Sequence, residues 1–465
     1  MSRKKKTSSK RRMAGPVPKG LPPNCLTKSL LKKHNFTNSQ RRVVITGYGM
    51  ITPLGKNTEE TFENASNGRS GIDFISSFET KGLPCRIGGE VDDACLNNNS
   101  ENSQAQRLEK FSSRALKLLR IATLEAVQQA KLNKVTNREK IGVSIGTHGD
   151  NPKVEDMMFL HKFYDGNGNW DMKRLTQAGG YSYLKFFRRK PDVAASILSK
   201  LFNCKGHNFS LVSACAAGSQ AIGEAYKVIQ EGKCDVMIAG GGEATLDFTG
   251  LMGFVLLKAL TEKYKTPQTA SRPFDRRRNG FVLSEGAGVV ILEELEHARS
   301  RGIPISGELF GYGSSADAYR ITDTHPKGEG AKIAMRRALE DASISSDNID
   351  CINAHGTSTQ QNDLTETRAI KEIFGEKAKD IPVYSNKSML GHTIAAAGAI
   401  EFILTLIGIN RSILLPTINY DHPDPKCDLD YVPNEARSKK HRKAISNSFG
   451  FGGQNSCLCL GEYEK

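Results

Sequence analysis

The feature that most constrains this chain is an order of predicted elements that occurs twice. In each half a helix is followed by a short apolar strand, at residues 141–149 ("IGVSIGTHG") and 349–357 ("IDCINAHGT"). Each half then has a second helix and a strand that leads into a glycine-rich loop, at residues 234–244 and 443–456. Short buried strands that alternate with helices are typical of layered α/β proteins. The repeat therefore predicts a duplicated α/β domain with its joint near Gly302–Ser306.

A basic leader precedes the repeat. Residues 1–42 contain 13 of the chain's 65 Lys and Arg residues and none of its 50 Asp and Glu residues. The rest of the chain is therefore nearly neutral, which argues against a nucleic-acid-binding protein with a basic face on its folded part. We divide the 465 residues into a basic disordered leader (1–41), an N-terminal half (42–302) and a C-terminal half (303–465).

The composition of the leader bears on localisation. It lacks the apolar core of a secretory signal, and its basic, hydroxyl-rich, acid-free composition is typical of an organellar transit peptide. We expect a mitochondrial protein, with plastid or cytoplasmic localisation as alternatives. Lys outnumbers Arg, so a nuclear signal around Lys4–Lys6 and Lys10–Arg12 or a plain basic tail remain open. No run of about 18 apolar residues occurs, so we expect no membrane span.

The cysteines bear on the redox environment. Ten are present, and none forms a CxxC pair. Cys457 and Cys459 alternate on a predicted strand, which places them on one face. This usage fits a reducing compartment with mostly inert thiols, and it argues against a disulfide framework or a zinc site.

One cysteine, Cys215, lies in the stretch "LVSACAAGSQAIGEA" (211–225). Phe209, Leu211 and Val212 predict a buried strand before it, and the apolar residues after it recur at helical spacing. Cys215 is then either a small core residue at a strand–helix junction or a nucleophile at a helix N-terminus, where a thiol loses its proton more readily. The stretch alone is compatible with both interpretations.

Two further segments carry candidate chemical groups. "NAHGTSTQQND" places His355 at the end of a predicted strand, and "SNKSMLGHTIAAAGAIE" places Lys387 and His392 before a predicted helix. Singly, these side chains also fit a core histidine, a solvated charge and a helix cap. However, functional groups of α/β sheets gather outside the carboxyl ends of strands. A cysteine with two histidines at such positions forms a candidate centre for covalent catalysis.

A glycine-rich turn, "NSFGFGGQN" at residues 447–455, carries Phe449 and Phe451. Alone it indicates only a backbone that needs glycine's freedom. The chain has no GxxxxGK[ST] or GxGxxG motif, which argues against a phosphate-binding loop of either kind.

Together these segments resemble the β-ketoacyl-acyl-carrier-protein synthases, the condensing enzymes of type II fatty-acid synthesis, and among them the mitochondrial form. The resemblance extends from Arg42 to about Gly461. It is carried by "VVITGYGMITPLG" (43–55), "SACAAGSQA" (213–221), "SRPFDRRRNGFVLSEGAGVVILEELEHA" (271–298), "NAHGTST" (353–359), "NKSMLGHTIAAAG" (386–398) and "NSFGFGG" (447–453). The resemblance implies the thiolase-like fold, with two related halves in α-β-α-β-α layers, and a homodimer.

The Cys-His-His set resembles that of the elongating branch, because initiating synthases have Asn at the second histidine and thiolases use a second cysteine. The implied reaction is a decarboxylative Claisen condensation. Cys215 would take an acyl chain from acyl-carrier protein as a thioester, with its thiolate favoured by a helix beginning near Ala216. His355 and His392 would stabilise the enolate formed when malonyl-carrier protein loses CO₂, and the product would be two carbons longer.

The resemblance also implies roles for neighbouring residues. The N–H groups of Cys215 and Phe451 would form an oxyanion hole. Catalytic support would come from Lys387, Glu401, Asp363 and Glu366, with a structural role as an alternative for the two residues at 363 and 366. Substrate-binding residues would be Thr357, Thr359, Phe449 and Phe451, the two threonines on the phosphopantetheine arm and Phe451 as an aromatic gate. The reaction would need no metal and no cofactor, since the substrates are carried on phosphopantetheine.

The chain departs from the family pattern at three places. Gln360 stands where the family often has Pro, Gln454 where it has Thr, and residues 150–190 have no clear match, which leaves the chain-length preference open. The acidic carrier protein would dock on a basic patch. Candidates for that patch are Arg107, Lys110, Arg114, Lys117, Arg188–Lys190 and Lys258.

Other functions remain to be weighed against this one. A polyketide-type condensing enzyme of the same fold is the main alternative, although the chain has no attached acyltransferase or reductase region. A non-catalytic chain-length factor would lack the cysteine that is present at position 215. A basic nucleic-acid-binding protein would depend on residues 1–42 alone.

Overall fold

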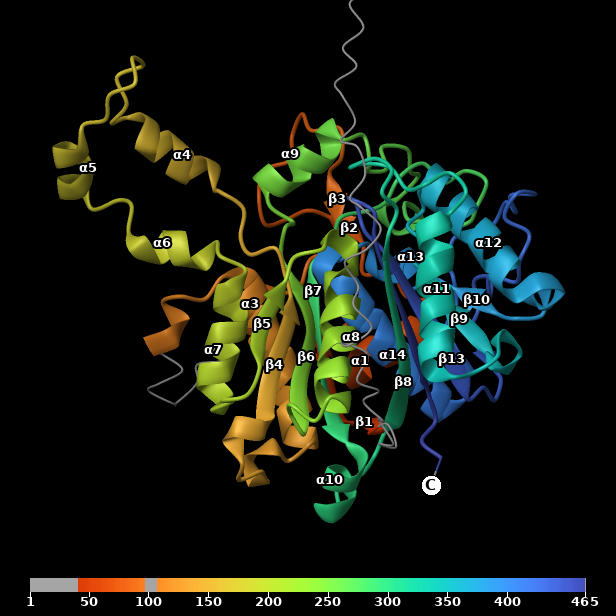
Figure 1. The fold of residues 1–465 in the computed structure, drawn as a ribbon. Helices are drawn as coiled ribbons and strands as arrows, with labels where there is room; N and C mark the ends of the chain where they lie inside the picture. The colour runs from red at the N-terminus through yellow and green to blue at the C-terminus, as the bar shows by residue number, and fades with distance from the viewer. Residues whose placement is uncertain (1–40, 97–106, 465) are drawn as a thin grey trace, which may run out of the picture. The chain divides into compact units, whose positions relative to one another are not determined.

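The computed structural model describes residues 41–96 and 107–464 (Figure 1). All but the last residue of the predicted leader therefore lies outside the described residues. The polar stretch "LNNNSENSQAQ" (96–106) predicts a loop, and all of it but residue 96 also lies outside them. The elements of the first half are β1 (Val43–Ile51), α1 (Thr58–Ser66), β2 (Asp73–Phe74), β3 (Ile87–Gly88), α3 (Arg114–Gln129), β4 (Ile141–Gly146), α4 (Val154–His161), α5 (Met172–Ala178), α6 (Tyr183–Arg188), α7 (Asp192–Phe202), β5 (Asn208–Leu211), α8 (Ala217–Gln230), β6 (Val236–Glu243), α9 (Phe248–Leu256), β7 (Gly286–Glu294) and α10 (Leu295–Ser300).

The second half repeats much of this order. Its elements are β8 (Gly307–Ala316), α11 (Glu329–Ala342), β9 (Cys351–Asn353), α12 (Gln360–Phe374), β10 (Val383–Tyr384), α13 (Lys387–Leu390), α14 (Ala397–Arg411), β11 (Ile413–Leu414), β12 (Arg437–Ser438), β13 (Lys443–Phe449) and β14 (Gln454–Gly461).

The main sheet shows the duplication directly. Its strand order is β10-β9-β13-β14-β8-β1-β7-β6-β4-β5, so that β8 and β1 lie at the centre and each half contributes five strands. Strand β4 runs parallel to β5 and β6, just as β9 runs parallel to β10 and β13. The antiparallel series β6-β7-β1 is matched by β13-β14-β8. The predicted duplicated α/β fold is therefore confirmed.

Helices divide the molecule into five layers (Figure 1). Helices α8 and α14 lie side by side in the middle, where α8 packs on β4 and β6 and α14 packs on both β7 and β13. The outer face of the first half is covered by α3 and α7, and that of the second half by α11 with α12 beside it. This arrangement confirms the α-β-α-β-α layers.

The central helix α14 is unusually apolar. One segment of the described residues, Ile394–Arg411, is long and apolar enough by length and composition to cross a membrane. Of this segment, 89% is buried, and α14 packs between the two halves of the sheet. An apolar surface on all sides is what a helix needs when strands cover it from two directions.

Two glycine-rich stretches are strands, contrary to the prediction. The apolar run Val43–Thr46 predicts a strand that ends at Gly47 and Gly49, but β1 continues through both. A Cβ on Gly49 would lie 2.2 Å from the carbonyl oxygen of Ala122, so the glycines let α3 pack directly on the strand. Likewise, residues 240–242 belong to β6 and do not form a loop.

The strand before Cys215 is also different from the prediction. Strand β5 lies at the edge of the sheet and is only half-buried. Val212, which was expected inside, is 56% exposed. A sequence pattern of apolar residues cannot distinguish an edge strand from a central one, because both are apolar.

Residues 154–188, which we call the arm, extend from the body between β4 and α7 (Figure 1). The Gly- and Asn-rich residues 164–180 predict a loop or insertion, and the prediction of a loop is wrong in part because α5 lies within that range. The arm is held together by Asp156, whose carboxylate lies 2.5 Å from Lys185 Nζ and 2.7 Å from Arg189 Nη2.

Candidate active site

Cys215 lies in a three-residue turn, Ala214–Ala216, between β5 and α8. Ala214 has a φ of 48°, which turns the chain sharply so that Cys215 stands at the start of the helix. The residues that follow are small because α8 and α14 meet here: a Cβ on Gly218 would lie 2.6 Å from the carbonyl oxygen of Ala395. The Cys215 residue is only 2% exposed.

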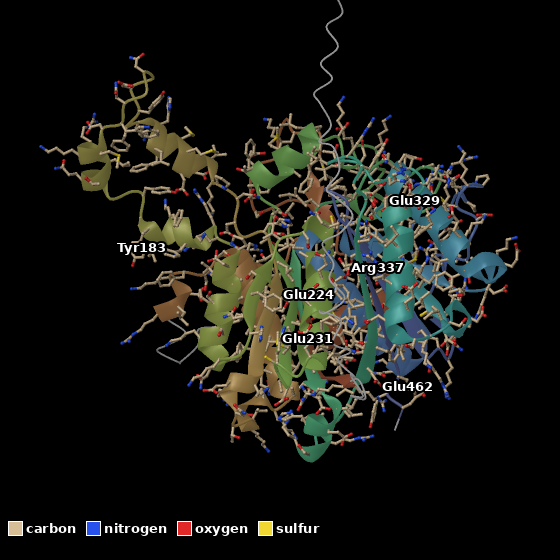
Figure 2. All side chains as sticks on the ribbon, in the orientation of Figure 1. Tyr183, Glu224, Glu231, Glu329, Arg337 and Glu462 are labelled. Carbon is tan, nitrogen blue, oxygen red and sulfur yellow. The ribbon has the colours of Figure 1, made fainter. Side chains whose placement is uncertain are left out.

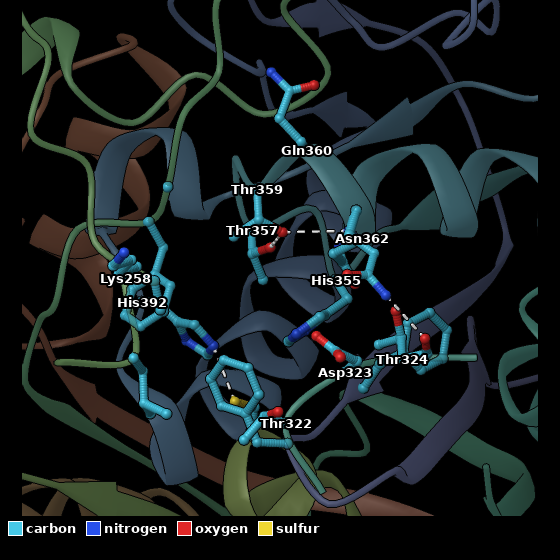
Figure 3. A pocket seen from close by; sticks show the side chains of 18 of the residues that line it. Lys258, Thr322, Asp323, Thr324, His355, Thr357, Thr359, Gln360, Asn362 and His392 are labelled. Carbon is cyan, nitrogen blue, oxygen red and sulfur yellow. Dashed lines mark hydrogen bonds between the residues drawn. The ribbon is translucent and has the colours of Figure 1, made fainter. Parts of the chain in front are cut away.

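The structure brings together the three side chains that the sequence singled out. One sulfur or nitrogen atom from each of Cys215, His355 and His392 lies within 4.8 Å of the other two. His392 Nε2 is 3.1 Å from Cys215 Sγ, the contact that a dashed line marks in Figure 3. The two imidazole rings lie nearly perpendicular, with centroids 5.4 Å apart.

The hydrogen bonds of His392 define its tautomer. The backbone N–H of Ile394 donates to Nδ1 over 3.2 Å, so this nitrogen carries a lone pair. In the neutral ring the proton then resides on Nε2, which faces the Cys215 sulfur. His392 is therefore a hydrogen-bond donor toward the reacting atoms.

The same tautomer argues against a metal at these three residues. A zinc ligand must offer a lone pair, but Nε2 of His392 offers one only if the Ile394 contact at Nδ1 is lost. The positive charge of Lys387, which acts on Cys215 and on both histidines, opposes a second cation. The chemistry of this set favours a thiol with donors around it.

Burial controls the ionisation of the site. It raises the pKa of the Cys215 thiol to about 11, and the charge of Lys387 lowers it only in part. Desolvation thus outweighs the lowering by Lys387 and by the backbone N–H groups, and the effect of the start of α8 on the thiolate stays a prediction. Burial, together with the charge of Lys387, lowers the pKa of His355 and His392 well below the ordinary value, so both imidazoles are neutral.

Two backbone N–H groups also point at the sulfur. Those of Cys215 and Phe451 donate toward Sγ and lower its pKa. Phe451 belongs to the turn between β13 and β14, where Gly452 and Gly453 have φ values of 87° and 79°. Glycine is required at these two positions because the left-handed conformation is costly for other residues. The pair of donors can bind an oxygen that develops negative charge.

Two buried acids hold the loop that carries His355. The carboxylate of Glu366 accepts the N–H groups of His355 and Gly356, both over 2.8 Å, and that of Asp363 accepts the N–H of Thr357 over 3.0 Å. Burial raises the pKa of Glu366 to about 7. These contacts are to the backbone, which is the structural role that the sequence left open for both acids.

Lys387 and Glu401 form a buried ion pair. Lys387 Nζ lies 2.5 Å from Glu401 Oε1, and both side chains are 2% exposed. Burial raises the pKa of Glu401 to about 7, although Lys387 opposes the shift. Lys387 was open to interpretation as a solvated charge; the structure places it inside, where its field reaches Cys215 and both histidines.

A cavity of about 480 Å³ opens from Cys215 to the surface (Figure 3). Thr357 and Thr359 line it with their hydroxyls 3.0 Å apart, and Phe449 and Phe451 line its inner end. Sequence analysis did not identify several lining residues, which come from three separate segments: Asn279, Thr322, Asp323, Thr324 and Gln361.

The basic candidates for docking separate into two groups. Lys258 lines the cavity mouth. Arg114 is committed elsewhere, because it binds the buried carboxylate of Glu285 through two nitrogens, each over 2.7 Å. Lys117 pairs with Glu109 over 3.1 Å. Lys258 is therefore the candidate with a direct position at the cavity.

Comparison with known proteins places this arrangement in context. The family model "Beta-ketoacyl synthase, N-terminal domain" matches residues 40–298, and "Beta-ketoacyl synthase, C-terminal domain" matches residues 306–421. The chain is 40% identical over 430 residues to 3-oxoacyl-[acyl-carrier-protein] synthase 2 of Staphylococcus aureus (strain COL), covering 92% of this chain and 100% of that one. The enzyme of the same name from Synechocystis sp. is 41% identical over 431 residues, covering 91% and 99% of the two chains.

Solved structures show the same likeness. A β-ketoacyl synthase from Burkholderia phymatum STM815 matches with a TM-score of 0.78 and 30% identity, covering 91% of this chain and 100% of that one. A type II polyketide ketosynthase bound to its acyl-carrier protein and a hexaketide matches with a TM-score of 0.78 and 33% identity, with the same coverage.

Proposed function

Because the chain belongs to the β-ketoacyl synthase family, we propose that Cys215, His355 and His392 together carry out its condensing reaction. The chain is an acyltransferase-type condensing enzyme of type II fatty-acid synthesis, which elongates acyl chains by two carbons as a 3-oxoacyl-[acyl-carrier-protein] synthase does. The observation that supports these residues is the meeting of one buried thiol with two neutral imidazoles at the inner end of a single cavity.

The first step is transfer of the acyl chain. The sulfur of Cys215 attacks the thioester carbon of acyl-carrier protein, the carbon–sulfur bond to phosphopantetheine breaks, and the proton of Cys215 leaves with the carrier thiol. The N–H groups of Cys215 and Phe451 bind the oxygen as it becomes negative. Donation from His392 Nε2 helps the sulfur to carry negative charge, since Nδ1 is already occupied by Ile394.

The second step is condensation. The thioester oxygen of malonyl-carrier protein accepts hydrogen bonds from His355 and His392, CO₂ leaves, and the remaining electron pair forms an enolate. The enolate carbon attacks the acyl carbon on Cys215, and the thiolate that leaves recovers a proton. Neutral imidazoles suit this step because they donate without adding charge. The balance of both steps calls for no metal and no cofactor beyond the phosphopantetheine arm.

Intact mass spectrometry tests this assignment. The purified protein is incubated with acyl- and malonyl-carrier protein, and we expect an acyl adduct on Cys215 followed by a 3-oxoacyl product. C215A should show neither. Condensation by C215A, or an adduct on another residue, would overturn the assignment.

The supporting residues act around this centre. We propose that Lys387 and Glu401 fix the field at the histidines and that Thr357 and Thr359 bind the phosphopantetheine arm. A polyketide-type reaction remains the alternative, and the likeness to a polyketide ketosynthase supports it. Saturated acyl-carrier protein and a polyketide-length acyl-carrier protein, offered in competition, distinguish the two by which one loads Cys215.

We propose a homodimer from the exposed apolar surface of the arm. Seven of its large apolar side chains are 40% to 66% exposed (Tyr183 is labelled in Figure 2): Met157, Met158, Trp170, Met172, Tyr183, Phe186 and Phe187. The edge strand β5 adds unpaired backbone groups and the exposed Val212. Sedimentation should give a dimer that F186E/F187E weakens and that F74E, an exposed control outside the arm, leaves intact.

We also propose that the basic leader directs the protein to mitochondria. The support is compositional: residues 1–42 hold 13 basic residues and no acidic ones. A fusion of these residues to a fluorescent reporter should enter mitochondria. A plastid, nuclear or cytosolic signal would overturn this proposal.

A further inference from the structure

A buried carboxylate, Glu243, is paired with a histidine, and its charge acts on the catalytic cysteine. Glu243, the last residue of β6, is fully buried, and its Oε2 lies 2.6 Å from Nδ1 of His148. Its Oε1 accepts the N–H of Ala244 over 3.1 Å. Among the ion pairs of the described residues, His148 is the one cationic partner that Glu243 has.

The fold places this pair where β4 and β6 end, next to the start of α8. Strands β4 and β6 run in parallel register, with Gly146 opposite Gly241. A Cβ on Gly146 would lie 2.4 Å from the backbone of Ala217, at the start of α8, so these strand ends press against the turn that carries Cys215. The negative charge of Glu243 reaches Cys215 and raises its pKa.

A matching pair elsewhere shows what is unusual here. Glu293 is equally buried and lies 2.5 Å from Nδ1 of His297. However, Glu293 also binds Arg301 through two nitrogens, over 2.8 Å and 2.9 Å. Because Arg keeps its charge at all relevant pH values, Glu293 is always compensated. Glu243 is compensated only while His148 holds its proton.

We propose that His148 and Glu243 are positioning residues that make the reactivity of Cys215 depend on whether His148 is protonated. With His148 protonated, the pair is neutral and exerts little field on the thiol. When His148 loses its proton, a bare carboxylate remains beside Cys215 and opposes formation of the thiolate. The inference rests on the proposed function of Cys215 and adds a control over how readily that residue is loaded.

The surroundings of His148 shift its pKa in two opposite directions. Burial alone would lower its pKa, but the hydrogen bond and charge of Glu243 raise it above the ordinary value. Other charged groups also face the pair. Asp150, whose pKa burial raises to about 6, interacts with Glu243, with Lys153 and with Asp247 at the start of α9. Asp150 therefore titrates at the acid end of this range, below the raised pKa of His148.

The test measures alkylation of Cys215 by iodoacetamide, an uncharged reagent, from pH 6 to 9.5 with quantification of the Cys215 peptide. While the pH is below the pKa of a thiol, its alkylation rate rises about tenfold for each unit by which the pH increases. In the wild type we expect the alkylation rate to rise less steeply with pH where His148 titrates. Above that region the rate should be about two- to tenfold lower than the low-pH slope extrapolates to. E243Q and H148R should both restore the full slope, the first by removing the carboxylate and the second by supplying a permanent cation.

H297Q is the matched control and should keep the shallow region, because Arg301 still compensates Glu293. A full slope in the wild type, or a shallow region that survives in E243Q and H148R, would overturn the proposal. If E243Q fails to fold, H148R still decides, since this side chain is 29% exposed and has room toward solvent. Alkylation reads the thiol without condensation, so failure of the proposed function would be seen separately.

Discussion

The turns that begin α8 and α14 have nearly the same backbone and different chemistry. Each is a three-residue turn, Ala214–Ala216 and Ile394–Ala396, whose first residue has a positive φ, 48° in one and 44° in the other. The second residue is Cys215 in the first turn and Ala395 in the second. The two halves therefore have similar helix starts. The side chain at the second position of the turn and the groups that face it decide which of them is a catalytic site.

The largest expected effect comes from moving the thiol between the turns. C215A should lose the acyl adduct and reduce condensation by more than about a thousandfold. The double variant C215A/A395C should not recover either, because His392 Nε2 and the N–H of Phe451 both face residue 215. An acyl adduct on residue 395 of the double variant, detected by peptide mass spectrometry after proteolysis, would show that the two turns are chemically equivalent.

The next effect separates loading from decarboxylation. H392A should still be acylated on Cys215 but should decarboxylate malonyl-carrier protein about a hundred- to a thousandfold more slowly, since one donor to the enolate is lost. Release of ¹⁴CO₂ and intact mass measure the two steps. H161A, an exposed histidine of the arm, is the control. Equal loss of both steps would assign His392 to the thiol alone.

The contact between the two turns should show in stability. A Cβ on Gly398 would lie 2.0 Å from Ser219 Oγ, and one on Gly218 would lie 2.6 Å from the oxygen of Ala395. G398A and G218A should each lower the free energy of unfolding by about 1–3 kcal/mol through overpacking, measured by urea denaturation. G253A, in α9 with open space around it, should be neutral or stabilising by up to about 1 kcal/mol. If G398A and G218A both leave the free energy of unfolding unchanged, the starts of α8 and α14 are not tightly packed against each other.

The smallest effect concerns helix caps. The inner helices α8 and α14 follow Ala216 and Ala396, which have no capping side chain, whereas the outer helix α3 is capped by Ser113, whose hydroxyl accepts the N–H of Leu116 over 3.1 Å. S113A should cost about 1 kcal/mol of unfolding free energy. A396G, at an uncapped start, removes a buried methyl group but no cap hydrogen bond, so it should cost about 1 kcal/mol in the same assay through lost burial alone. A larger loss at residue 396 would mean that the inner turns carry hidden capping interactions.

Part of this molecule could be predicted from its sequence. The alternation of short apolar runs with helices was enough for the duplicated α/β fold, since periodicity reports burial on each face. Cys215 and His355 could be singled out because each follows a predicted strand, and His392 because it lies just before a predicted helix. Glycines misled the prediction at residues 47, 49 and 240–242, where they permit close packing of strands and do not end them.

Other features depend on contacts that no local pattern contains. His148 and Glu243 are 95 residues apart, and their pairing follows only from the adjacency of β4 and β6. The raised pKa of Cys215 depends on how completely the other half of the molecule covers it. Sequence thus located the reacting groups, whereas their protonation required the assembled fold.

The burial of α14 between the two halves has a consequence for biosynthesis. The first half leaves the ribosome before α14 exists, so the inner faces of β6 and β7 and one side of α8 stay uncovered during that time. Domains generally fold as units, but here the central layer is complete only when Arg411 has been made. A nascent chain of this protein therefore exposes apolar surface of β6, β7 and α8 until the last helix of the middle layer has been synthesised.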